Sequence, residues 1–167
     1  MTSRATTAVP VESVEARAYT IPTDAPESDG TLAWDSTTLV LVTARAGDKV
    51  GTGYTYADTP VVTVVRSKLA DVVTGRDALQ PPARWAEMQH AVRNLGKPGV
   101  VAEAISAVDI ALWDLRARLL DEPLTIALGA VHDATPIYGS GGFTSYDNDT
   151  LRPSYVAGSR PGSRESR

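Results

Sequence analysis

The carboxylates of Asp109 and Asp114 lie where two acids could hold a metal ion or act as an acid and base pair, within a segment of helical periodicity. Five residues apart on a helix, their side chains point about 140° away from each other. They therefore cannot share a site within one helix. Asp114 precedes Arg118 by four residues, which favours an ion pair on the helix surface. A structural role is the better interpretation of both acids.

Other residue types with catalytic potential are sparse. His90 lies in an expected helix and His132 in a linker, and neither has a carboxylate or a second histidine at a ligand-like spacing. The chain has no cysteine, which excludes disulfides, thiolate metal sites and cysteine nucleophiles. Gly51-Thr52-Gly53 lacks the third glycine and the following helix of a phosphate loop. We therefore assign no catalytic residue and no metal ligand in this chain.

Three aromatic residues are the candidate substrate contacts. Trp34 stands alone among small and polar neighbours, and Tyr54 and Tyr56 end an expected strand. Aromatic rings pack on ligands, and tyrosine hydroxyls also form hydrogen bonds, so these residues are suited to line a substrate mouth. The alternative is that they pack between a loop and the rest of the domain.

The apolar pattern predicts an antiparallel meander of three strands. Residues 11–21 alternate between apolar and polar side chains, and residues 37–45 are apolar on both faces, as in a central strand covered on both sides. Residues 50–56 return as a third strand after the turn residues 46–49. Residues 22–35 contain two prolines, a glycine and four acidic residues, which predicts a long loop.

From Pro60 the apolar period becomes helical, which predicts helices over residues 60–75, 81–95 and 101–119. The third is the clearest element, because its core positions follow spacings of 3 and 4: Val101, Ile105, Val108, Leu112, Leu115 and Leu119. Ile110, Trp113 and Leu120 extend the apolar surface around the other sides of this helix. We therefore expect it to be sandwiched between two bodies.

The composition bounds the class of protein. Of 167 residues, 43% are hydrophobic and 22% charged, which is typical of one globular domain with loose ends. The net charge of −4 argues against nucleic-acid binding. No apolar run approaches the roughly 20 residues needed to cross a bilayer, and the start has no apolar signal region. We expect no membrane association and a cytoplasmic location.

The last 17 residues differ in character from the rest: twelve of them are Arg, Ser, Gly or Pro. No apolar periodicity remains there, which predicts a disordered tail over residues 151–167. A segment of this composition is what a GC-rich gene produces when it is read out of frame. We therefore expect a frameshift or a premature stop near residues 146–150.

The order of a meander, three helices and a glycine-rich strand resembles the mandelate racemase and muconate lactonizing branch of the enolase superfamily. The most specific part is the run Ala-Ile-Ser-Ala-Val-Asp-Ile-Ala-Leu-Trp-Asp at residues 104–114, and the similarity covers residues 11–146. In that family the meander and helices form a cap over a TIM barrel. The resemblance implies an α+β fold with the first strand of an uncompleted barrel at residues 136–143.

The resemblance also implies a domain organisation. Residues 1–10 would be a disordered start, 11–130 the capping domain, 131–150 the first barrel strand and the start of the barrel, and 151–167 the tail. Residues 22–35 and 53–59 would be the two substrate-specificity loops, which contain Trp34, Tyr54 and Tyr56. Without a barrel, the third helix and the inner side of the meander would expose an apolar patch, which favours self-association.

Family members remove a proton next to a carboxylate, with Mg²⁺ stabilising the enediolate and a lysine or histidine as the base. The substrate of such an intact enzyme would be a small carboxylate or an acid sugar. The family places a Lys-x-Lys pair and the Asp and Glu metal ligands on later barrel strands, and no lysine follows Lys97 here. We expect this chain to bind no cofactor itself, whereas Mg²⁺ is expected in the intact family enzyme.

The sequence leaves two accounts of the function open. The first is an inactive capping fragment whose parent is a racemase, cycloisomerase or acid-sugar dehydratase. The alternative is a free-standing α+β module that binds a small molecule or a separately encoded barrel. A third account, an enzyme complete in itself, requires an acid and base pair that the sequence does not offer.

Overall fold

The computed structural model describes residues 8–136 and 142–158. These residues fall into two compact units. The first unit contains residues 8–20 and 38–129. The second contains residues 21–37, 130–136 and 142–158.

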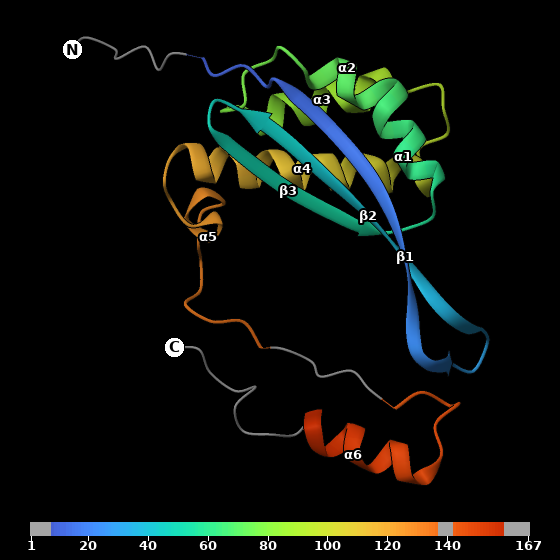
Figure 1. Cartoon of the computed structure of the whole chain (residues 1–167). Helices are drawn as coiled ribbons and strands as arrows, with labels where there is room; N and C mark the ends of the chain where they lie inside the picture. The colour runs from blue at the N-terminus through green and yellow to red at the C-terminus, as the bar shows by residue number, and fades with distance from the viewer. Residues whose placement is uncertain (1–7, 137–141, 159–167) are drawn as a thin grey trace. The chain divides into compact units, whose positions relative to one another are not determined.

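The sheet has three strands, β1 (Ser13–Ser28), β2 (Ala33–Ala46) and β3 (Lys49–Tyr56), in the order β1-β2-β3 (Figure 1). β2 pairs antiparallel with β3, from Leu39 opposite Tyr56 to Ala46 opposite Lys49. Two residues, Gly47 and Asp48, are left to form the turn, and Gly47 takes a positive φ of 56°. The structure confirms the predicted meander.

The long loop predicted at residues 22–35 is wrong, because β1 continues to Ser28 and β2 already begins at Ala33. Only a tight turn separates them, closed by a hydrogen bond from the Asp29 amide to the Leu32 carbonyl. The prolines at 22 and 26 lie in β1, which is an edge strand of the sheet. An edge strand tolerates proline, because its outward amides need no partner strand.

The predicted helices are confirmed, although the second ends at Ala91 rather than at residue 95, and the first contains a π-helical segment, η1. The helices of the first unit are α1 (Pro60–Val64), η1 (Val65–Leu69), α2 (Ala70–Val73), α3 (Pro81–Ala91), α4 (Val100–Leu119) and α5 (Leu124–Ala127), a short helix that the sequence pattern does not predict. None of the helices in residues 8–136 and 142–158 combines the length and the apolar character that crossing a bilayer requires.

The core of the first unit lies between one face of the sheet and the helices, which gather on that side (Figure 1). Its largest fully buried side chains include Leu69, Met88, Ile105, Leu112 and Leu115. The inner side of the meander is therefore covered by the chain's own helices, which corrects the expectation that it would be left open. The opposite face carries Leu39 and Leu41, both half-buried, so β2 is central but covered on one face only within the described residues.

The second unit contains residues 21–28 of β1, residues 33–37 of β2 and the helix α6 (Asn148–Gly158). The Asp147 carboxylate begins this helix by accepting a hydrogen bond from the Thr150 amide at 2.8 Å. α6 extends into residues 151–167, where no element was predicted. Of the expected barrel strand at 136–143, residues 137–141 lie outside the described residues, and the described remainder is not a strand. No barrel strand is present in the part of the chain that the structure describes.

Candidate functional site

Tyr54 and Tyr56 lie on the face of β3 that points away from the helices. They pair with Leu41 and Leu39 of β2, respectively, and their rings meet edge to face with centroids 6.4 Å apart. Their exposed fractions are 55% and 69%, so both are available to a ligand. The loop predicted at residues 53–59 is wrong for its first part, because β3 extends to Tyr56 and only Ala57 to Thr59 connect it to α1.

The Gly51-Thr52-Gly53 segment lies against α4 and is not a ligand loop. A Cβ atom added to Gly51 would lie 2.6 Å from the Leu115 Cβ and in contact with the backbone of Ala111. A Cβ atom on Gly53 would lie 2.6 Å from the Ala111 amide nitrogen. The two glycines therefore allow the backbones of β3 and α4 to touch.

Asp114 also links α4 to β3. Its Oδ2 accepts hydrogen bonds from the Thr52 amide at 2.8 Å and from the Arg118 Nε at 2.9 Å. The predicted ion pair with Arg118 is confirmed. The bond to Thr52 gives Asp114 a second structural role, because β3 is an edge strand and the outward Thr52 amide would otherwise lack a partner. The sequence could not show this contact, since it joins residues 62 positions apart.

Asp109 is the least satisfied of the acids on α4. Its Oδ1 is buried and has no hydrogen-bond partner in the described residues. Burial raises the pKa of this carboxyl above its usual value. No group of three or more His, Asp or Glu side chains in the described ranges is arranged to hold a metal ion. The described residues therefore do not fit a Mg²⁺ site, and neither acid has a catalytic partner.

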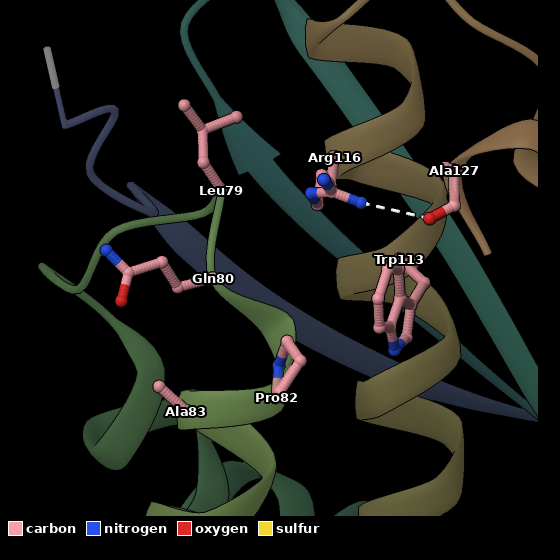
Figure 2. A pocket seen from close by; sticks show the side chains of 7 residues that line it. All are labelled: Leu79, Gln80, Pro82, Ala83, Trp113, Arg116 and Ala127. Carbon is pink, nitrogen blue, oxygen red and sulfur yellow. Dashed lines mark hydrogen bonds between the residues drawn. The ribbon is translucent and has the colours of Figure 1, made fainter. Parts of the chain in front are cut away.

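A groove of about 460 Å³ opens between the start of α3, the second half of α4, and α5 (Figure 2). Arg116 lies over the Trp113 ring, 5.3 Å from its centroid, and donates a hydrogen bond to the Ala127 carbonyl at 3.1 Å. The remaining lining residues are Leu79, Gln80, Pro82 and Ala83. The groove offers apolar walls and one guanidinium, which suits a small ligand with an anionic group. The sequence did not single out this site, although Trp113 and Arg116 lie one helical turn apart.

The outward side of α4 is apolar and open. Ile110 and Leu120 are 40% and 44% exposed, and Trp113 is half-buried between them along the helix. Ile126 and Leu128, in and just after the neighbouring α5, are each 56% exposed. These five residues are called the α4–α5 face below. Ile110, Trp113 and Leu120 are the residues for which the sequence predicts contact with a second body, and Ile126 and Leu128 extend that surface.

Trp34 belongs to the second unit, where it packs on Phe143 rather than standing free. The two rings meet edge to face with centroids 5.6 Å apart, and Phe143 meets Tyr146 in the same way at 5.4 Å. The Trp34 indole N–H donates to the Glu27 carboxylate at 2.7 Å. The ring is thus held by an acid across the hairpin and by an aromatic residue more than 100 positions away. Tyr54 and Tyr56 belong to the first unit.

Comparison with known proteins places these observations in a family. A model of the N-terminal domain of the mandelate racemase / muconate lactonizing enzyme family matches residues 14–129. The chain is 33% identical over 138 residues to the 3,6-anhydro-alpha-L-galactonate cycloisomerase of Streptomyces coelicolor, which covers 78% of this chain and 38% of that relative.

Solved structures give the same result. A mandelate racemase/muconate lactonizing enzyme-like protein from Rubrobacter xylanophilus is 59% identical with a TM-score of 0.86, over 89% of this chain and 41% of that one. The L-talarate/galactarate dehydratase of Salmonella typhimurium LT2, liganded with Mg and L-lyxarohydroxamate, is 26% identical with a TM-score of 0.80, over 94% of this chain and 43% of that one. The chain spans less than half the length of the relatives that it matches.

Proposed function

Because the chain belongs to the mandelate racemase / muconate lactonizing enzyme family through its N-terminal domain, we propose that residues 11–130 act as the capping domain of an enzyme of that family. The family match over residues 14–129 carries this proposal, since it spans the three strands and the helices α1 to α5. The proposed parent reaction is Mg²⁺-dependent removal of a proton next to a carboxylate, in a racemase, a cycloisomerase or an acid-sugar dehydratase.

We propose that the chain does not turn over substrate by itself. The described residues offer no metal cluster, and no lysine follows Lys97 to act as the base. A relative with bound Mg is a dehydratase more than twice as long as the matched region. The catalytic groups would therefore come from a β/α-barrel, and this chain would contribute the wall that covers it.

The α4–α5 face is the proposed contact with that barrel. An apolar stripe that includes Ile110, Trp113 and Leu120 would be unfavourable in water, and a barrel surface would bury it. The same face would favour self-association in the absence of a barrel.

The proposed substrate is a small carboxylate or an acid sugar, as the names of the relatives indicate for those proteins. Trp34, Tyr54 and Tyr56 are proposed to line its entrance. The exposed rings of the two tyrosines and the fixed indole of Trp34 support this role, since rigid aromatic rings offer area and hydrogen bonds at little entropic cost.

The test is to co-express the full chain with the barrel portion of the Rubrobacter xylanophilus relative and to purify through a tag on the barrel. We expect a stable complex, which Ile110→Glu abolishes and which Thr63→Glu, on an exposed position of α1, leaves intact. The chain alone should show no Mg²⁺-dependent turnover of any acid sugar. Turnover by the chain alone, or the absence of a complex with wild-type chain, would contradict the proposal.

The groove in Figure 2 favours one alternative, a free-standing module that binds a small anionic molecule through Arg116. In that case the purified chain should be monodisperse, melt cooperatively, and gain thermal stability from a carboxylate ligand. Replacing Arg116 by Met should remove that gain. A chain that is stable only together with a barrel would exclude this function.

A further inference from the structure

A polar cluster joins the tip of the β1–β2 hairpin to a residue far along the chain, and we infer that this residue, Thr144, positions the hairpin and its tryptophan. Thr144 is 116 residues from Ser28, its main partner. Both belong to the second unit. No motif in the sequence points to Thr144.

Thr144 contacts the hairpin through both its backbone and its side chain. Its amide donates to the Ser28 carbonyl at 2.9 Å. Its hydroxyl lies 2.7 Å from the Ser28 hydroxyl, 2.9 Å from the Ser28 carbonyl and 3.0 Å from the Asp29 carbonyl. The Thr144 hydroxyl thus lies within hydrogen-bond distance of three oxygens, two on Ser28 at the end of β1 and one on Asp29 in the turn that follows.

The end of the hairpin that Thr144 holds is itself ordered. The Asp29 carboxylate accepts hydrogen bonds from the Thr31 amide at 2.6 Å, the Thr31 hydroxyl at 2.8 Å and the Leu32 amide at 2.8 Å. These bonds keep the pKa of the Asp29 carboxyl below its usual value. The turn is therefore a rigid piece, and fixing it at Ser28 fixes the strands on both sides of it.

The residues next to Thr144 and Ser28 connect this contact to Trp34. Phe143 precedes Thr144 and meets the Trp34 ring edge to face, and Glu27 precedes Ser28 and accepts the indole N–H. The polar contact and the aromatic contact therefore act on adjacent residues of the same two segments. Losing the Thr144 hydroxyl should loosen both Phe143 and Glu27, and with them the indole of Trp34.

The role of this contact in selecting substrate rests on the proposed function, in which the hairpin is a specificity element. If Trp34 lines the substrate entrance, Thr144 sets where that ring lies. Thr144 is thus a positioning residue for specificity. The hydrogen bonds themselves stand without that proposal.

The experiment follows the three tryptophan indole N–H signals of the full chain by ¹⁵N NMR, with Trp34 assigned from a Trp34→Phe variant. In Thr144→Val, the Trp34 indole signal should shift and exchange with solvent about fivefold faster, as expected for the loss of one hydrogen bond. Trp85 and Trp113, in the first unit, should not change. Thr144→Ser should restore the Trp34 signal, and Ser145→Ala, an exposed neighbour, should leave it unchanged.

An unchanged Trp34 signal in Thr144→Val would overturn the inference. If that variant does not fold, which the Trp85 and Trp113 signals report, Ser28→Ala provides the test, since it removes one hydroxyl and keeps the backbone bonds. It should accelerate exchange of the Trp34 indole by a smaller factor, and no acceleration would refute the role. The measurement needs no barrel, so it can fail while the chain still forms the complex with a barrel, and it can succeed when that complex does not form.

Discussion

The contact between the β3 glycines and α4 gives the sharpest stability prediction. Gly51→Ala places a methyl group 2.6 Å from the Leu115 Cβ and against the Ala111 backbone. Such distances are shorter than real Cβ atoms accept, and the Ala111 backbone cannot rotate away as a side chain would. The substitution must therefore push α4 away from β3.

The size of the effect follows from that displacement. Moving a helix outward by about 0.5–1 Å forfeits roughly a quarter to a half of each van der Waals contact across the gap, and each contact is worth about 0.1–0.2 kcal/mol. With tens of atom pairs between α4 and the sheet, the loss is about 2–3 kcal/mol, in line with overpacked cores. That is a large part of the roughly 5–15 kcal/mol that stabilises a domain.

Urea denaturation of the full chain, followed by circular dichroism, measures this loss as a lower midpoint at a similar slope. Gly30→Ala is the matched control, because a Cβ atom there meets nothing within 4 Å. That control should change the free energy of unfolding by no more than about 1 kcal/mol, in the stabilising direction. Equal midpoints for Gly51→Ala and Gly30→Ala would refute the close backbone contact.

Variants at three further positions test other features of the first unit by the same denaturation assay. Asp114→Ala should cost about 1–2 kcal/mol, because the Thr52 amide loses its acceptor, whereas Asp114→Asn should cost less. Burial raises the pKa of Asp109, so the folded state holds its proton more tightly than the unfolded chain does, and stability falls as the pH rises through the raised pKa. Asp109→Asn should remove this pH dependence and be more stable than the wild type near neutral pH. A wild-type urea midpoint that does not change with pH in this range would contradict the role of Asp109. Asp121 lies just beyond the C-terminus of α4 and has a positive φ of 54°, so Asp121→Gly should stabilise the chain by about 0.5–1 kcal/mol, whereas Asp121→Ala should destabilise it.

The regular elements were predictable from the sequence because their periods are set by burial on one face. The stripe of α4 from Val101 to Leu115 is buried as predicted, and so are the inward residues of β2. The loop predicted at residues 22–35 was wrong because these residues include part of an edge strand, where proline is tolerated. Proline has no N–H to donate, so Pro22 and Pro26 argue against a strand only where a neighbouring strand would need that donor. At the edge of the sheet there is no such neighbour.

The candidate site was less predictable, because its contacts join distant residues. The sequence could identify Trp34 as an aromatic in unusual surroundings, but it could not show Phe143 as its neighbour. Likewise the Gly51-Thr52-Gly53 pattern is uninformative until Ala111 and Leu115 are seen to lie against it. A pattern of small residues indicates that another segment of the chain packs closely there, and only the fold shows that this segment is α4.

The same contacts explain why α4 presents a ready surface for a partner. The glycines of β3 hold the helix by its backbone, and Asp114 ties it to the strand edge. The helix that bears Ile110, Trp113 and Leu120 is thus held in place by β3 before any partner is present. Binding to a surface that is already ordered avoids the entropic cost of immobilising it. A cap that must seat on a barrel benefits from that order, and a cap loosened by Gly51→Ala should therefore bind the barrel more weakly even under conditions where it remains folded.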